Sequence, residues 1–217
     1  MSLRSSKLNR TYKVKKCVGI LSTPDTNIKK YVEWFKKKNV NIIIIPYDTT
    51  EHETYFRMIN GLLIPGTRRG INKFDATIMD CISTFLLLSL NDYFPIWGTC
   101  FGFQALICLI GGFKKLKKYK LVGIHPIHAT KSRMFSHDMD LKMHHNHDYG
   151  ISVEDFTNNS DLRRFFTICA TAGDEEYIGA IEAKHFPIYG TSWHPELHDP
   201  TEHFSSFFIS ELKKNKH

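Results

Sequence analysis

The residues best suited to chemistry surround Cys100, in the sequence Gly98-Thr99-Cys100-Phe101-Gly102. This pattern has the G-x-nucleophile-x-G form of a nucleophile elbow, with cysteine in place of serine. Glycines give the backbone room for a tight turn from strand to helix, and the turn holds the central side chain in a strained position. A thiol at a helix N-terminus also experiences the positive end of the helix dipole, which favours the thiolate. We therefore interpret Cys100 as a nucleophile.

A second segment, Trp193-His194-Pro195-Glu196, supplies the base that such a nucleophile needs and a group to orient the base. Pro195 favours an extended backbone at His194. Because residues two apart in an extended chain project to the same side, Glu196 can follow His194 into one site. A His-Pro-Glu triplet alone is weak evidence, but with the elbow at Cys100 it predicts a Cys-His-Glu triad.

The remaining four cysteines have a simpler interpretation. The five cysteines are odd in number, widely spaced and set mostly in apolar runs, which argues against a disulfide framework and indicates a reduced compartment. We expect these four to be small, buried packing residues: Cys17, Cys81, Cys108 and Cys169.

A histidine-rich segment precedes the second motif. Imidazole is a common metal ligand, but the chain contains no H-E-x-x-H and no paired C-x-x-C. We therefore predict no metal and no cofactor, and interpret the segment as a polar loop that carries one functional histidine. The histidines concerned are His125, His128, His137, His144, His145 and His147.

The elements that must position these residues alternate between short apolar runs and amphipathic helices. Strands are expected at 17–21, 42–45, 61–64 and 94–97, and helices at 27–38, 51–59, 75–90 and 101–110. This order predicts an α/β fold, with a mostly parallel central sheet covered by helices on both faces. Residues 120–133 and 165–192 are expected to extend the sheet with antiparallel strands. A closing helix is expected at 201–214, with four residues turned inward: Phe204, Phe207, Phe208 and Leu212.

Composition fits one intracellular domain. The chain has 217 residues, of which 42% are hydrophobic, and we expect a single domain at 17–217 behind a basic, poorly ordered tail at 1–16. The tail contains no apolar stretch of signal-peptide length, and no run reaches the roughly 18 apolar residues of a membrane span. The expectation is a soluble, cytoplasmic protein without a membrane partner.

The net charge of +7 would draw polyanions to the surface. A basic run lies between Lys114 and Lys120, and such runs are usually solvated surface. Its functional interpretation is attraction of an anionic substrate. A nucleic-acid partner is not predicted, because no recognised binding module or aromatic stacking pattern is present.

Four segments, taken in order, resemble class I glutamine amidotransferase domains and, within that group, the γ-glutamyl hydrolases. They are Ile59–Gly66, Asp92–Phe103, Ser132–Phe135 and Tyr189–Glu196. Such ordered agreement over most of the chain is more specific than any single motif.

The resemblance implies a class I glutamine amidotransferase-like fold, a flavodoxin-like arrangement, and a cysteine hydrolase that cleaves γ-glutamyl amide bonds through an acyl-enzyme. The implied substrate is a small molecule, a folyl or other poly-γ-glutamate, and a homodimer is left open. By the same resemblance, Gly66 and Phe101 would form the oxyanion hole with their backbone amides. The resemblance assigns substrate-binding roles to His147, Arg133 and Ser192.

The chain departs from the family pattern after Gly66, where Thr67, Arg68 and Arg69 stand in place of a second glycine. Their bulk and charge would alter the substrate pocket. Two other functions stay open at this point: a glutaminase subunit that delivers ammonia to a separate synthase, and a catalytically idle binding protein on the same scaffold. The intact triad argues against the idle protein, and no synthase domain is visible in the sequence.

Overall fold

One mixed sheet forms the centre of the molecule. The computed structural model describes residues 15–36, 38–68, 76–173, 176–200 and 202–215, so most of the predicted tail at 1–16 lies outside them. The parallel strands are β1 (Cys17–Ser22), β2 (Asn41–Pro46), β3 (Gly61–Ile64), β4 (Ile96–Thr99) and β9 (Ile188–Thr191). The antiparallel strands are β5 (Lys117–Ala129), β6 (Met139–Gly150), β7 (Phe166–Ala172) and β8 (Tyr177–Ala183).

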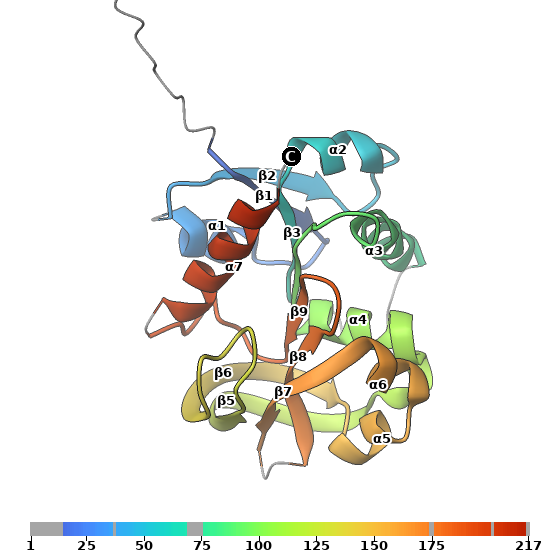
Figure 1. Ribbon diagram of the computed structural model, residues 1–217, viewed down its shortest axis with the longest axis vertical. Helices are drawn as coiled ribbons and strands as arrows, with labels where there is room; N and C mark the ends of the chain where they lie inside the picture. The colour runs from blue at the N-terminus through green and yellow to red at the C-terminus, as the bar shows by residue number, and fades with distance from the viewer. Residues whose placement is uncertain (1–14, 37, 69–75, 174–175, 201, 216–217) are drawn as a thin grey trace, which may run out of the picture.

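The order of these strands confirms the predicted fold class. Within the described ranges they form a nine-stranded sheet in the order β2-β1-β3-β4-β9-β8-β7-β5-β6 (Figure 1). The first five pair in parallel and the rest pair antiparallel with their neighbours. The antiparallel half of the sheet therefore begins at β8, which lies beside β9. The His-Pro-Glu segment follows directly after β9.

The inner parallel strands β1, β3, β4 and β9 are buried on both faces, which explains their uninterrupted apolar runs, whereas the edge strand β2 is mostly exposed or partly buried. Along β1, Val18 and Ile20 face one core cluster, whereas Cys17 and Leu21 face the other. This alternation with a period of two residues is the geometry of a strand. Each short run therefore supplies apolar side chains to two cores at once.

Helices cover both faces. α1 (Ile28–Lys36) and α7 (His203–Lys214) lie on one side of the central strands, and α3 (Ala76–Ser89) and α4 (Phe101–Gly111) lie on the other (Figure 1). Shorter helices are α2 (His52–Met58), α5 (Val153–Thr157) and α6 (Ser160–Phe165), and Phe113–Lys115 form a 3₁₀ turn. None of the helices in the described part of the chain is long and apolar enough to cross a membrane.

The closing helix packs as expected. Of its four predicted inward residues, three are buried and Phe207 is partly buried. The three buried ones are Phe204, Phe208 and Leu212. α1 contributes Tyr31 and Phe35 to the same core, so the N-terminal and C-terminal helices share one face of the sheet.

The prediction of a polar loop in the histidine-rich segment is wrong. Residues 139–150 form strand β6, which pairs with β5 from Lys117↔Gly150 to Ala129↔Met139. Alternate side chains of β6, namely Met143, His145 and His147, are buried. The polar composition concealed the strand because two of the three inward positions carry imidazole instead of aliphatic groups. Helices α5 and α6 were not predicted either, although their N-caps Ser152 and Asn159 are residue types that favour a helix start.

Candidate active site

Cys100 lies in the turn between β4 and α4. Its backbone has φ 48° and ψ −100°, a conformation that L-residues rarely adopt. The turn is held by two backbone bonds: Cys100 N–H donates to Thr191 O at 2.8 Å, and Gln104 N–H donates to Cys100 O at 3.0 Å. A side chain on Gly98 would collide with the backbone of Gly102, so the turn requires glycine there. The strained elbow predicted from the sequence is thus present.

Cys100 is 4% exposed. It stands at the N-terminus of α4, where the helix dipole favours negative charge. Its Sγ donates to the Asn146 carbonyl oxygen at 3.7 Å, so β6 forms one wall beside the sulfur.

His194 and Glu196 follow β9 and form a hydrogen-bonded pair. Nδ1 of His194 is 2.7 Å from Oε1 of Glu196. The His194 backbone N–H donates to His144 O at 2.8 Å, which ties this segment to β6. Because Glu196 accepts the proton on Nδ1, Nε2 is left as the basic nitrogen. Nε2 is buried, and the neighbouring Cys100 side chain acts on this imidazole.

Electrostatics link His194 to the thiol. Burial lowers the pKa of His194, but the adjacent Cys100 and Glu196 outweigh this effect and raise it well above the ordinary value. This is the direction expected for an imidazole that takes up a proton beside a thiolate and a carboxylate. By contrast, burial raises the pKa of Cys81 and of Cys108 to about 12, which keeps these thiols protonated and inert.

Gly66 lies between the two halves of the site. A Cβ built on Gly66 would stand 2.6 Å from Cε1 of His194 and 3.3 Å from Cβ of Cys100. Only glycine leaves room for these two side chains to approach the loop after β3. The structure therefore brings Gly66, Cys100, His194 and Glu196 together.

Tyr31, on α1, contacts this loop in a way that sequence reasoning missed. The Gly66 N–H donates to the Tyr31 hydroxyl at 2.8 Å, and that hydroxyl is 2.9 Å from Oγ1 of Thr99. The tyrosine is 2% exposed, and burial together with the Glu196 charge raises its pKa. The spacing of apolar residues in α1 does not indicate that the Tyr31 hydroxyl meets the predicted oxyanion loop.

His147 lies in β6 beside a second buried histidine. Its Nε2 is 3.3 Å from Nδ1 of His145, and its ring packs against Tyr119. Burial lowers the pKa of His147 to about 4, and burial with the nearby His147 lowers that of His145 to about 3. Both imidazoles are therefore neutral near pH 7.

Arg133 and Ser192 lie in different surroundings. Arg133 Nε is 3.6 Å from Oε1 of Glu182, and the guanidinium lies 5.2 Å over the Tyr189 ring. These contacts hold Arg133 against β8 and β9, and none of its described contacts reaches Cys100. Ser192 is 5% exposed, and its Oγ makes no hydrogen bond to a described atom. A role for either residue in substrate binding stays a prediction.

The four other cysteines are free and buried, as the sequence predicted. Within the described residues, no group of three or more His, Cys, Asp or Glu side chains is arranged to hold a metal ion.

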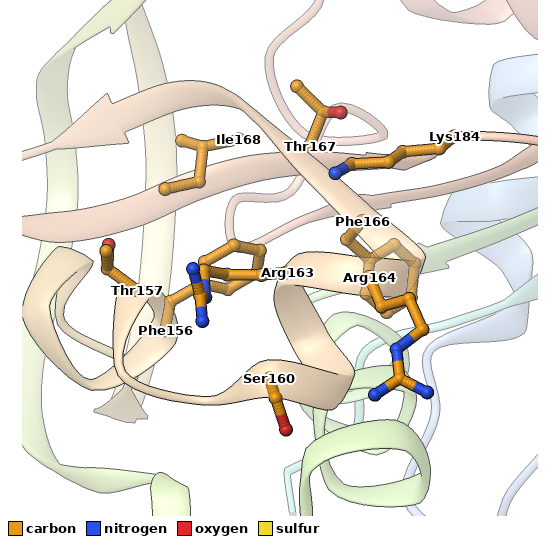
Figure 2. A pocket seen from close by; sticks show the side chains of 9 residues that line it. All are labelled: Phe156, Thr157, Ser160, Arg163, Arg164, Phe166, Thr167, Ile168 and Lys184. Carbon is orange, nitrogen blue, oxygen red and sulfur yellow. The ribbon is translucent and has the colours of Figure 1, made fainter.

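Two hollows in the described structure differ in size and lining. The first, the Gly66 cavity, has a volume of about 190 Å³ and is lined by residues that include Gly66, Tyr31, Arg68 and Glu196. The second, the outer depression, has a volume of about 720 Å³. Figure 2 shows its side chains, which come from α5, α6, the start of β7 and Lys184: Phe156, Thr157, Ser160, Arg163, Arg164, Phe166, Thr167, Ile168 and Lys184.

Comparison with known proteins places these features in a family context. A family model described as "Glutamine amidotransferase class-I" matches residues 23–213. The γ-glutamyl hydrolase of Mus musculus is 32% identical over 227 residues, and that of Bos taurus 31%; each match covers 86% of this chain and 71% of the relative. Gamma-glutamyl hydrolase B of Dictyostelium discoideum is 30% identical, covering 92% of this chain and 73% of the relative.

A solved structure agrees in fold. The glutaminase domain of Trypanosoma brucei CTPS, determined with bound acivicin, superposes with a TM-score of 0.71. Its sequence is 13% identical, and the match covers 94% of this chain and 96% of that one. At this identity the likeness shows the fold alone.

Proposed function

The chain belongs to the class I glutamine amidotransferase family and, within it, to the γ-glutamyl hydrolases, and from that premise we propose that Cys100, His194 and Glu196 cleave folyl or other poly-γ-glutamates. The chain is thus an enzyme that hydrolyses γ-glutamyl bonds. The single observation that carries the triad is the convergence of a strained, buried thiol with the His194–Glu196 pair around Gly66.

In the proposed acylation step, the Cys100 sulfur attacks the γ-carbonyl carbon as a thiolate whose proton has passed to Nε2 of His194. Glu196 holds Nδ1 and stabilises the imidazolium, which accounts for the raised pKa of His194. His194 then gives its proton to the departing amine nitrogen. The C–N bond breaks and a γ-glutamyl thioester remains on Cys100.

In the deacylation step, water attacks the thioester carbonyl and transfers a proton to His194. The C–S bond breaks, the product leaves with a new γ-carboxylate, and the thiol regains its proton. Neither proposed step uses a cofactor or changes an oxidation state. Each step replaces one bond to the carbonyl carbon by another.

The proposed oxyanion hole consists of the backbone amides of Gly66 and Phe101. Two donors aimed at the developing oxyanion are worth about 3–4 kcal/mol each in a dry site. Because the Gly66 N–H donates to the Tyr31 hydroxyl, a substrate carbonyl oxygen must replace that acceptor. We propose that this exchange accompanies substrate binding.

The experiment that tests this function compares two substrates. Pure protein is incubated with a pteroyl oligo-γ-glutamate and, separately, with free glutamine, and released glutamate and ammonia are measured. The proposal predicts release of glutamate or of a shorter γ-glutamyl peptide from the oligomer without any partner protein. Hydrolysis of glutamine alone would instead identify a glutaminase subunit.

A further inference from the structure

The Gly66 cavity carries charges that the proposed triad does not use. Lys30 from α1 and Arg68 from the loop after β3 line it, together with Asp25 and Glu196. Glu196 is engaged by His194, so its charge is directed to the proposed triad. The lining therefore balances two cations against two carboxylates, and Lys30 and Arg68 are the groups in it that can bind an anion.

The cations are available to a ligand. Arg68 is exposed and forms no ion pair with another residue in the described part of the chain. Lys30 has one neighbouring carboxylate, with Nζ 3.9 Å from Oε2 of Glu33, and both side chains are about half exposed. An exposed pair of this length contributes little. Among the ion pairs of the described residues, a bound carboxylate would therefore compete only with this weak Lys30–Glu33 pair.

The position of the cavity suits one group of the proposed substrate. Gly66 borders both the cavity and the Cys100 side chain. In a γ-glutamyl group, the α-carboxylate lies about 5 Å from the carbonyl carbon that the thiolate attacks, four covalent bonds away. A planar guanidinium can hold such a carboxylate through two parallel hydrogen bonds.

We propose that Arg68, assisted by Lys30, binds the α-carboxylate of the γ-glutamyl residue whose carbonyl reacts with Cys100. This inference rests on the proposed function and makes Arg68 a specificity-determining residue. Thr67 stands where the family pattern has a second glycine, and Arg68 follows it directly, so this altered loop supplies a carboxylate clamp to this chain. Asp25 lines the same cavity and disfavours a second negative charge there.

A substrate pair that differs in one group tests the clamp. The first has a free α-carboxylate on the reacting γ-glutamyl residue, and the second has an α-carboxamide of the same size. Arg68→Gln should lower kcat/KM roughly tenfold for the carboxylate and less than about twofold for the carboxamide, because a hydrogen bond to a charged group is lost in one case only. Lys30→Gln should show the same selectivity with a smaller loss.

The matched control is Arg57→Gln, which removes an exposed arginine of α2 that does not line the cavity and pairs with Glu53 at 3.1 Å. This variant should leave kcat/KM unchanged for both substrates. An equal loss on both substrates, or no loss on either, would overturn the clamp.

Binding to Cys100→Ala, measured by calorimetry with the two uncleaved substrates, separates this inference from the proposed function. In that background, Arg68→Gln should weaken the affinity for the carboxylate ligand roughly tenfold and leave the affinity for the carboxamide ligand unchanged. If wild type cleaves neither substrate, the proposed function fails. The binding comparison then still decides the clamp, and equal affinities in both backgrounds would reject it.

Discussion

The Gly66 cavity and the outer depression contrast in every property that bears on catalysis. The depression is the larger, about 720 Å³ against about 190 Å³. It has a partly apolar floor, including buried Phe156 and Phe166, and exposed cations at Arg163, Arg164 and Lys184. Its lining includes no cysteine, histidine or carboxylate.

The smaller cavity is lined by Glu196 and by Gly66, and Gly66 closely approaches the buried His194 ring and the strained turn at Cys100. Preorganised groups in a desolvated site stabilise developing charge far more than mobile groups in water. The contrast therefore teaches that volume and positive charge do not identify the site of chemistry in this fold. Backbone strain and paired titratable groups identify that site.

The largest expected effect comes from removing the proposed nucleophile of the smaller cavity's site. Cys100→Ala should lower kcat by about five orders of magnitude, because it removes the attacking atom while deleting little packing. The matched controls are Cys169→Ala, which deletes a buried thiol elsewhere, and the triple variant Arg163→Gln, Arg164→Gln, Lys184→Gln in the outer depression. Both should keep kcat within about twofold of wild type if folded by circular dichroism. Loss of turnover in the triple variant would indicate that the outer depression, and not the site at Cys100, is needed for catalysis.

The next effect ranks the two partners of the thiol. His194→Asn should cost about ten- to a hundredfold more in kcat than Glu196→Gln, because His194 transfers the proton whereas Glu196 orients and stabilises it. Steady-state kinetics of both variants give the comparison directly. A His194→Asn enzyme as active as wild type would remove this histidine from the role of base.

A third effect concerns stability and sharpens the difference between buried and exposed histidines. The pKa of His145 is lowered to about 3, below its ordinary value of 6.5, so the unfolded chain binds this proton between about pH 3 and pH 6.5 and the folded chain does not. Stability should therefore fall as pH falls through this window. Urea midpoints at pH 7 and pH 4.5 should differ less in His145→Gln than in wild type.

The exposed control for this measurement is His137→Gln, since His137 contacts only Ser136 through its ring in the described structure. Its urea midpoint should depend on pH as the wild-type midpoint does. An unchanged pH dependence in His145→Gln would contradict the assignment.

The smallest effect belongs to the basic run after α4. If these cations attract a polyanionic γ-glutamyl tail, added salt should lower kcat/KM a few-fold and leave kcat nearly constant, because the Debye length falls from about 10 Å at 0.1 M to about 3 Å at 1 M. Lys117 is already paired with Asp155 at 2.7 Å, so most of the effect should come from its neighbours. Replacing Lys114, Lys115, Lys117 and Lys118 by Gln should flatten the salt dependence. Equal kcat/KM for short and long tails at low salt would argue against attraction.

The same contrast explains what the sequence could and could not predict. Cys100 and His194 were predictable because local rules govern them: flanking glycines mark a strained turn, and a following proline marks an extended strand end. The parallel strands were predictable because both of their faces are apolar. Local pattern and global fold agree in these segments.

Other features depend on contacts between segments far apart in the chain. The Tyr31 hydroxyl meets Gly66 across 35 residues, and no spacing within α1 reports that partner. Strand β6 was mistaken for a loop because its inward histidines become compatible with burial only as neutral imidazoles beside one another. The Gly66 cavity likewise combines α1, the loop after β3 and the segment after β9. Its charge balance was therefore invisible in the sequence.

The central claim, covalent catalysis by Cys100, is tested most directly by trapping the intermediate. Wild-type protein is mixed with an activated γ-glutamyl ester, which speeds acylation relative to deacylation, quenched in acid within milliseconds, and digested for peptide mass spectrometry. The account predicts that the peptide containing Cys100 gains the mass of the γ-glutamyl acyl group, and that hydroxylamine removes it as the hydroxamate. Turnover of the ester with no adduct at Cys100, or with the adduct on another cysteine, would contradict it.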